Sequence, residues 1–470
     1  MTELTDKLHE ECGLFGIFDL EKTLDVAHTT YSALYALQHR GQQSAGIAVN
    51  NEGKIYCHRD SGLANEVFNE MVLNYLSGNY ALGHVRYATA GSESRENAQP
   101  FVIKYHKGQM AIAYNGNIIN ANKLRGELEE KGAMFQTQSD TEIISYIITR
   151  ERLHVQTTEQ AILNAMDKLI GAYSVVMLCS NKMIAIRDPN GFRPLCIGTL
   201  GNAYVIASES CAIDAVGGQF LRDIKPGEIV MINENGIKSN VSKCTCRGSL
   251  CVFEQIYFAR PDSVIDGQSV HHARLEAGRC LARRYGIDAD IVIGVPDSGI
   301  DAAIGYSYEA GIPYALGLIK NRYVGRTFIQ TKQTEREGLV KIKINAMASV
   351  VKNKRVIVVD DSIVRGTTTS NLIKLLREAG AREVHMRISS PPFLNPCYFG
   401  TDISSRDKLI ACRMSVDEIR KTLGADTLGY LEIEDLKQVV GDLKIGYCDA
   451  CFSAKYPLSV PINESGSVTA

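Results

Sequence analysis

The sequence predicts two domains in one chain: an α+β layered domain, then an α/β domain with a parallel sheet. From Cys12 to about Ile237, short alternating strands such as "GQMAIAYNG" and "AYSVVMLCS" come in runs beside helical patterns, which is typical of α+β layers. From about Gln255, continuous apolar strands are each followed by a helix, which is typical of a buried parallel sheet. The polar, turn-rich stretch "ENGIKSNVSKCTCRGSL" lies between them and predicts domains at 12–240 and 250–470.

Individual elements follow from the same patterns. Helical periodicity predicts helices over Asp25 to Gln38 and Thr141 to Thr149 in the first part. A further strand is expected in "NAYVIASES". In the second part, strands are expected in "ADIVIGVPDSG", "KRVIVVDD" and "AREVHMRISS", and an amphipathic helix follows the second of these.

Composition excludes several classes of protein. The 470 residues are 45% hydrophobic with a net charge of -2, so the chain is an ordinary globular protein without a basic field for nucleic acid. No apolar stretch approaches the roughly 18 residues that span a membrane. Met1 to Glu11 holds four carboxylates and no apolar run, so it is not a secretory signal. We therefore expect a cytoplasmic enzyme of small molecules, with 13 reduced cysteines and no disulfides.

The stretch "RVIVVDDSIVRGTTTSNLIKLLREAG" predicts a phosphate site. Its apolar strand ends at Asp360 and Asp361, and a short loop leads directly into a helix. Unpaired backbone N–H groups and hydroxyls at a helix N-terminus bind anions, and carboxylates at the end of a parallel strand can hold ribose hydroxyls or a metal-bound sugar. An acidic pair before a helix can also be an N-cap, but the loop favours ligand binding. The loop residues are Arg365, Gly366, Thr367 and Thr368.

This stretch resembles the binding signature of type I phosphoribosyltransferases. The resemblance extends to "GVPDSG", similar to the family's pyrophosphate loop, and to "GLIKNRYVGRTFIQ", similar to its mobile basic loop. It implies that Lys320 and Arg326 close over pyrophosphate, although a solvated basic loop is the alternative. Matching positions imply Mg²⁺ contacts at Ser298, Asp360 and Asp361.

The motifs of the first part resemble the N-terminal-nucleophile glutaminase domain, an αββα fold, of class II amidotransferases. They are "CGLFGI", "LQHRGQQSAGI", "GHVRYATAG", "YNGNI" and "SDTEII", in this order. A lone cysteine in an apolar setting is usually a core residue, but the order and number of motifs favour a nucleophile. The resemblance implies that residues 1–11 are a propeptide and that Cys12 becomes the first residue. Its α-amine, which titrates at about 8, can then act as the base.

Other roles in the glutaminase site are implied by matching positions. Arg86 and Asp140 resemble the residues that hold the α-carboxylate and the α-amine of glutamine. Asn115 and Gly116 resemble the oxyanion hole. Taken alone, Arg86 could form a surface ion pair and the Asn-Gly pair could be a hairpin turn.

Cysteines late in the chain suggest a metal site. "YCDACF" gives a C-x-x-C spacing, which alone is weak and needs two more thiolates. Resemblance to cluster-bearing relatives implies a [4Fe–4S] cluster, while the residues themselves leave zinc open. Cys244 and Cys246 are rivals for the first ligand. The implied ligands are Cys251, Cys397, Cys448 and Cys451.

Together the two parts resemble the amidophosphoribosyltransferase family, in its propeptide-bearing, iron–sulfur, Bacillus-type subfamily. The resemblance implies conversion of glutamine and phosphoribosylpyrophosphate to 5-phosphoribosylamine, glutamate and pyrophosphate, the first step of de novo purine synthesis, with ammonia passing inside the protein. It also implies a homotetramer inhibited by purine nucleotides. The alternatives are a phosphoribosylpyrophosphate-binding regulator, which would need neither Cys12 nor the glutamine clamp, and another class II amidotransferase, which would lack the phosphoribosyl signature.

Overall fold

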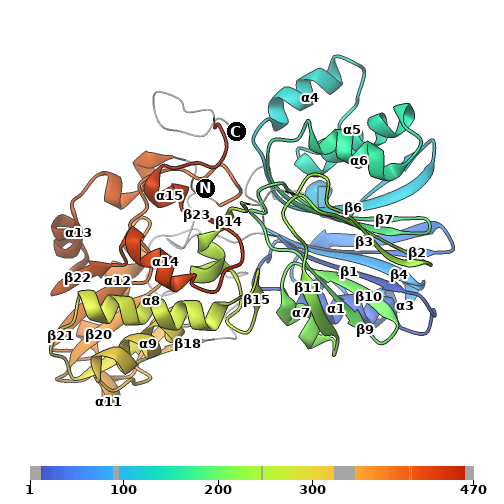
Figure 1. Ribbon diagram of the computed structural model, residues 1–470. Helices are drawn as coiled ribbons and strands as arrows, with labels where there is room; N and C mark the ends of the chain where they lie inside the picture. Colours follow the sequence, from blue (N-terminus) through green and yellow to red (C-terminus); the bar gives the residue numbers. More distant parts are fainter. Residues whose placement is uncertain are drawn as a thin grey trace.

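The computed structural model describes residues 12–87, 95–244, 247–321, 344–401, 403 and 405–460. Two bodies of secondary structure follow each other along the chain, blue to green and then yellow to red in Figure 1. The first has two antiparallel sheets between helices, and the second is built on a parallel sheet. The predicted fold class is confirmed. We call the two bodies the glutaminase half and the phosphoribosyl half, after the families that their motifs resemble.

The glutaminase half contains a seven-stranded and a six-stranded sheet. In spatial order, the first has β11 (Gln219–Asp223), β9 (Cys196–Leu200), β10 (Ala203–Ala207), β1 (Gly13–Asp19), β4 (Tyr80–Arg86), β2 (Ser44–Asn51) and β3 (Lys54–Ser61). The second has β13 (Gly236–Asn240), β12 (Ile229–Asn233), β8 (Met183–Arg187), β7 (Gly171–Cys179), β6 (Gly108–Ile118) and β5 (Phe101–Tyr105). The edge strand β13 occupies the start of the stretch expected to be a boundary, because a solvent-facing edge strand can be polar.

Alternating burial builds the layers of this half. Along β1, Leu14 and Phe18 join the core between the sheets, while Phe15 and Ile17 face the helical layer on the other side. Figure 1 shows the four layers of helix, sheet, sheet and helix. The helices of one outer layer are α1 (Val26–Ala36), α2 (Ala64–Val67), α3 (Glu70–Tyr75) and α7 (Ser210–Ala215). Those of the other are α4 (Ala121–Glu129), α5 (Asp140–His154) and α6 (Thr158–Met166).

The two helices expected here differ from the observed ones at their ends. Helix α1 begins one residue later than expected because Asp25 is its N-cap and accepts a hydrogen bond from the His28 amide at 3.0 Å. Helix α5 continues to His154, beyond Thr149, through a charged last turn that hides its periodicity.

The phosphoribosyl half is organised around four parallel strands. In spatial order they are β17 (Ile291–Gly294), β20 (Arg355–Asp360), β21 (Glu383–Ile388) and β22 (Thr427–Tyr430). Val356 and Val358 face one apolar cluster, and Ile357 and Val359 face another. Both faces are therefore covered, which explains the unbroken apolar sequence of β20.

Helices flank this sheet, and short elements complete the half. The helices are α8 (Val270–Arg284), α9 (Ile300–Ala310), α11 (Ala348–Val351), α12 (Thr367–Glu378), α13 (Val416–Leu423), α14 (Leu436–Val439) and α15 (Ala450–Ser453). The strand pairs are β14 (Leu250–Cys251) with β23 (Tyr447–Cys448), β15 (Val264–Ile265) with β16 (Gln268–Ser269), and β18 (Leu318–Lys320) with β19 (Ile344–Ala346). A π-helical turn, η2 (Glu254–Phe258), follows β14. In the described part of the chain, every helix is too short or too polar to cross a membrane.

Candidate functional site

Cys12 lies directly before β1, the central strand of the seven-stranded sheet. Strand β1 pairs with β10 on one side and β4 on the other, so its start is fixed from both sides. The Leu14 amide also donates to Ser208 Oγ at 3.0 Å. The Cys12 thiol is partly buried and lies 3.8 Å from the carbonyl oxygen of Tyr87. The fold therefore places the predicted nucleophile on a rigid strand end.

Arg86 ends β4 beside this thiol and is only 6% exposed. Burial lowers the pKa of Arg86, and the charge of the nearby Cys12 thiolate raises it in part. The turn of "LQHRGQQSAGI" packs against the same place, since the Gln43 amide donates to the Arg86 carbonyl at 3.0 Å. Arg86 is therefore a buried cation beside Cys12. Its burial excludes the alternative that Arg86 forms an ion pair on the surface.

Asp140 is the first residue of α5, and its carboxylate faces the end of β6. Its Oδ2 atom accepts hydrogen bonds from the Ile118 amide at 3.0 Å and the Tyr114 hydroxyl at 3.4 Å. Burial raises the pKa of Asp140 to about 6, although these bonds oppose the shift. Burial also raises the pKa of Tyr114, and the charges of Asp140 and Cys12 add to it. The Tyr114 hydroxyl therefore contacts the carboxylate and lies within range of the charge of Cys12.

Asn115 and Gly116 lie on β6, next to Tyr114. Asn115 is 1% exposed, and its Nδ2 has no hydrogen-bond partner within the described residues. Gly116 has a φ of 146°, and a Cβ there would come within 2.0 Å of the Ala172 carbonyl oxygen. The position therefore requires glycine. The Asn-Gly pair lies inside a strand, not in a hairpin turn.

Sequence reasoning did not single out His84 and Tyr114, although both lie within quoted motifs. Burial lowers the pKa of His84 to about 3, so the imidazole is neutral at ordinary pH. Its Nε2 lies 3.2 Å from the Tyr114 carbonyl oxygen and joins β4 to β6. These two residues link the strand that carries Arg86 to the strand that carries Asn115. Their position in "GHVRYATAG" and "YNGNI" is the only signal that sequence offers for them.

The acidic pair of the phosphoribosyl half lies where β20 ends, between two loops. Strand β17 forms a parallel bridge with Tyr314 on one side and pairs with β20 on the other. The chain therefore continues from β17 to one side of the sheet and later returns to its other side, so the strand order reverses between β17 and β20. Ligands of open α/β sheets bind at such a switch point. Asp361 is fully buried, and its carboxylate accepts from Ser298 Oγ and, at 2.5 Å, from Ser362 Oγ. Asp360, 2% exposed, accepts the Asp361 amide at 2.9 Å.

The loop after the acidic pair leads into α12, which begins at Thr367. Gly366 precedes it with a φ of 91°, a conformation that favours glycine. Thr367 is exposed, while Thr368 and Arg365 are partly exposed. The backbone N–H groups of a first helical turn point toward bound anions, so the loop has the geometry of a phosphate cradle.

The basic segment is described only in part. Lys320 ends β18, and its ammonium lies 2.8 Å from the Asp297 carboxylate in the "GVPDSG" loop. The two loops therefore approach each other. Arg326 lies outside the described residues.

The four implied cluster ligands gather at one place. Cys251 and Cys448 are opposite each other in the parallel pair β14–β23, and the Cys451 carbonyl accepts the Leu394 amide, three residues before Cys397. Burial raises the pKa of Cys448 to about 12 and that of Cys451 well above its usual value, and the neighbouring thiols add to both shifts. The twelve described cysteines are free thiols. No group of three or more His, Cys, Asp or Glu side chains among the described residues is placed to hold one metal ion.

This thiol group lies at the junction of the halves. The Cys251 amide donates to the Phe192 carbonyl at 3.1 Å, and Phe192 stacks on Phe399 with ring centroids 4.1 Å apart. The Tyr398 carbonyl accepts from Asn117 at 3.0 Å, next to Gly116. The segment after Cys397 therefore contacts the strand that carries the predicted oxyanion hole.

Comparison with protein families agrees with this architecture. Residues 84–215 match a model described as a glutamine amidotransferase domain, and residues 270–389 match one described as a phosphoribosyl transferase domain. The fold and the two sites define an enzyme in which a glutamine amidotransferase is joined to a phosphoribosyltransferase.

The family follows from whole-chain similarity. The amidophosphoribosyltransferase of Bacillus subtilis (strain 168) is 49% identical over 458 residues, covering 96% of this chain and 95% of that one. That of Archaeoglobus fulgidus is 49% identical over 459 residues, covering 96% and 99%. A solved structure of the B. subtilis glutamine phosphoribosylpyrophosphate amidotransferase with ADP and GMP has a TM-score of 0.89 at 48% identity, covering 97% and 99%. This chain belongs to the amidophosphoribosyltransferase family.

Proposed function

We propose that this enzyme transfers ammonia from glutamine to phosphoribosylpyrophosphate, giving 5-phosphoribosylamine, glutamate and pyrophosphate in purine biosynthesis. The observation that carries the proposal is the pairing of two sites in one chain. Cys12 stands at a rigid strand end beside buried Arg86, and Asp360 and Asp361 stand at the switch point of a parallel sheet. A phosphoribosyl-binding regulator would need no such thiol.

In the glutaminase half, the side chains divide into a clamp and a reaction centre. Arg86 pairs with the α-carboxylate of glutamine and Asp140 with its α-ammonium, a charge-complementary arrangement. The Cys12 thiolate attacks the carboxamide carbon, and the α-amine of the same residue accepts the thiol proton and returns it to the leaving ammonia. Water then hydrolyses the glutamyl thioester, which releases glutamate and the thiol. Asn115 Nδ2 and the Gly116 N–H stabilise the oxyanion. A buried Nδ2 with no partner in the described part of the chain supports this role.

In the phosphoribosyl half, the acidic pair holds the ribose hydroxyls and the loop from Arg365 to Thr368 binds the 5-phosphate. Lys320 and Arg326 lie over the leaving pyrophosphate. Mg²⁺ in such sites takes one or two carboxylates and completes its shell with substrate phosphates and water. Asp360 and Asp361, with Ser298 hydrogen-bonded to Asp361, fit that pattern. When bound, Mg²⁺ supplies charge neutralisation for the pyrophosphate.

Ammonia passes between the sites inside the protein. Ammonia is largely protonated in neutral water, and ammonium is not a nucleophile, so the path must exclude bulk solvent. Arg40, Arg193 and Glu254 are all fully buried where the halves meet, so bulk solvent is excluded from that part of the junction.

The four gathered thiols are proposed to hold a [4Fe–4S] cluster. Four cysteine thiolates are the usual ligands of such a cluster, and its role here is structural or a sensor of oxidation. Zinc holds sulfur at about 2.3 Å, which needs a tight ligand group. A cluster is larger than one ion, so its thiolates stand farther apart. Four thiolates alone also suit zinc, and the resemblance to cluster-bearing relatives favours iron.

Further properties are proposed from the family. The domains are 12–240 and 250–470, preceded by a propeptide at residues 1–11 that lies outside the described residues. The enzyme is a cytoplasmic homotetramer, and purine nucleotides inhibit it. The solved relative with ADP and GMP bound supports the last point.

The test is to measure glutamine-dependent and ammonia-dependent formation of phosphoribosylamine side by side. We expect both in the wild type and expect Cys12→Ala to lose only the first, since free ammonia bypasses the thiol. Equal loss of both reactions in Cys12→Ala, or a wild type with neither, would contradict the assignment.

A further inference from the structure

Arg40 is a fully buried cation that contacts the nucleophile residue and two carboxylates. Its Nε donates to the Cys12 carbonyl oxygen at 3.2 Å. One terminal nitrogen donates to Glu209 at 2.6 Å and to Glu254 at 3.0 Å, and the other donates to Glu254 at 2.9 Å. Arg40 thus joins the backbone of Cys12 to two acidic side chains.

Glu254 belongs to the other half of the chain. It is the first residue of the π-helical turn η2, 214 positions after Arg40, and it is fully buried. Both of its carboxylate oxygens accept from Arg40, and Arg193 lies 3.6 Å away. A bidentate pair fixes the plane of the guanidinium as well as its position. Glu254 therefore determines where the Nε of Arg40 points.

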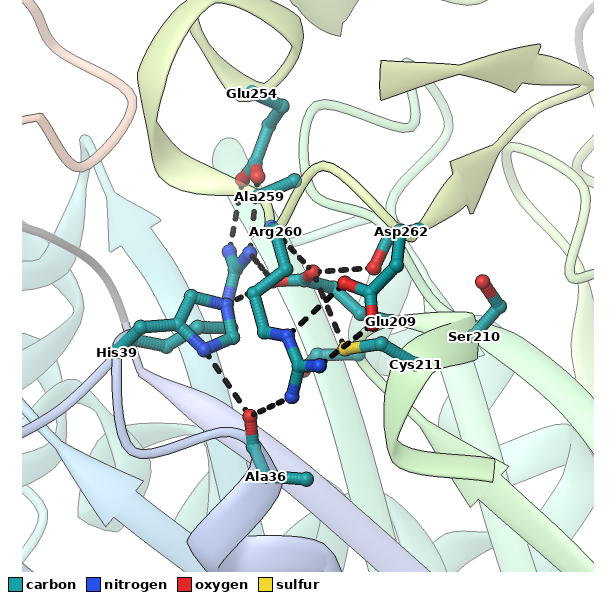
Figure 2. A network of polar contacts seen from close by, with 12 residues as sticks. Ala36, His39, Glu209, Ser210, Cys211, Glu254, Ala259, Arg260 and Asp262 are labelled. Carbon is teal, nitrogen blue, oxygen red and sulfur yellow. Dashed lines mark hydrogen bonds and ion pairs between the residues drawn. The ribbon is translucent and has the colours of Figure 1, made fainter. Parts of the chain in front are cut away.

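Glu209 completes the arrangement from the glutaminase half. His39 and Arg40 contact one of its oxygens, while the Arg260 amide and Ser263 Oγ donate to the other at 2.9 and 2.6 Å. Figure 2 shows Glu209 among His39, Arg260 and Cys211, with Glu254 on the turn above. Each carboxylate is held on more than one side, so the guanidinium between them has little freedom to move.

We propose that Glu254 is a positioning residue for the glutaminase reaction: it acts through Arg40 to fix the carbonyl of Cys12, so the phosphoribosyl half completes the glutaminase site. This inference rests on the proposed function. Once Cys12 is the first residue, its peptide bond to Gly13 is its only covalent attachment to the chain. A contact on its carbonyl then sets the orientation of both the α-amine and the thiol.

A second buried ion pair across the junction offers a matched control. Arg187, on β8, donates to Asp266 through both terminal nitrogens at 2.8 and 2.7 Å, and both residues are buried. Its other hydrogen bonds go to the carbonyls of Gly191, Arg193 and Ile224. Asp266 has a φ of 48°, which asparagine also tolerates, so Asp266→Asn removes the charge without backbone strain. This pair joins the halves at a place other than Cys12.

The experiment compares Glu254→Gln with Asp266→Asn in the full-length, processed enzyme. For Glu254→Gln we expect kcat for glutamine hydrolysis to fall about tenfold or more with KM for glutamine little changed, because the Arg86 and Asp140 clamp is intact. Ammonia-dependent synthesis should stay within about twofold of the wild type. Asp266→Asn should leave both reactions within about twofold of the wild type. Arg40→Lys, which keeps the charge but loses the bidentate pair, should match Glu254→Gln.

The double variant Arg40→Lys/Glu254→Gln should be no worse than the more severe single variant, since both act on one contact. The rate of Cys12 alkylation by iodoacetamide gives a second readout, expected to change in Glu254→Gln but not in Asp266→Asn. The proposal is overturned if Glu254→Gln behaves like Asp266→Asn, or if it loses both syntheses equally. If Glu254→Gln does not fold, Arg40→Lys with unchanged glutamine hydrolysis overturns it as well. A wild type that lacks glutamine-dependent synthesis would instead contradict the proposed function.

Discussion

The raised pKa of Asp140 predicts an unusual pH dependence of glutamine use. In the proposed clamp, only the carboxylate form of Asp140 can pair with the substrate ammonium. With a pKa of about 6, nine-tenths of the side chain is ionised at about pH 7 and one-tenth at about pH 5. A carboxyl with its usual value of 3.8 would remain almost fully ionised at about pH 5. The active fraction is therefore lost as the pH falls through about 6.

In the proposed mechanism the α-amine of Cys12 imposes its own decline, because it must be deprotonated to act as the base. Below about pH 8 it lowers kcat/KM about tenfold per pH unit, and Asp140 adds a further factor of about ten per unit below pH 6. A plot of log kcat/KM for glutamine against pH should thus steepen from a slope of about one to about two near pH 6. Because the pH dependence of kcat/KM reports the pKa values of the free enzyme, the break reflects the pKa of Asp140 in the unliganded site.

The assay is glutamine hydrolysis from pH 5 to 8 in the wild type and in Asp140→Asn. The variant should have a low kcat/KM and a slope near one throughout. Burial also raises the pKa of Asp188 to about 6, and that side chain accepts the Asn190 and Gly191 amides. Asp188 titrates in the same pH range, and its raised pKa by itself makes the fold more stable as the pH falls. Thermal unfolding measured at each pH separates a change in stability from a loss of binding. A break retained in Asp140→Asn, or a break near pH 4 in the wild type, would refute the reasoning.

Three other outcomes are expected. Asp361→Asn should abolish synthesis with either nitrogen source and leave glutamine hydrolysis, as followed by glutamate release; near-normal ammonia-dependent turnover would remove Asp361 from the ribose and metal role. Anaerobically purified protein should be brown with about four irons per chain, and Cys397→Ser should lower the iron content; stoichiometric zinc in colourless protein would refute iron. Mass spectrometry of active enzyme should find a chain that begins at Cys12, and full glutamine-dependent activity in a chain that keeps Glu11 would contradict the propeptide.

Much of the fold could be predicted because local patterns match it. The apolar run before Asp360 could only be a strand covered on both faces, and β20 is one. Asp25 and Ser139 are the N-caps of α1 and α5, so both helices begin near the expected places. Strand β13 was harder to foresee, because its sequence "GIKSN" is polar and its pairing comes from β12.

The candidate site could be predicted only in part, since contacts between distant residues leave no periodic signal. Arg40 stands inside a quoted motif, yet its partner Glu254 is 214 positions away. The approach of Cys251 to Cys448 depends on strands of two residues each, which are too short to show a pattern. The roles of Arg86, Asp140, Asn115 and Gly116 stay predictions, although the structure brings these residues together around Tyr114 and Cys12.

The contacts between the two halves fix the orientation of the glutaminase site relative to the phosphoribosyl site. Among the described residues, one apolar cluster contains residues of both halves, with Phe192 and Phe399 at its centre, and the other clusters lie within one half. Much of the remaining contact between the halves consists of buried ion pairs, Arg40 with Glu254 and Arg187 with Asp266. Apolar contacts tolerate sliding, whereas paired charges hold one orientation, since a displaced pair leaves uncompensated charge in a dry interior. The proposed delivery of ammonia from one half to the other requires such a fixed orientation.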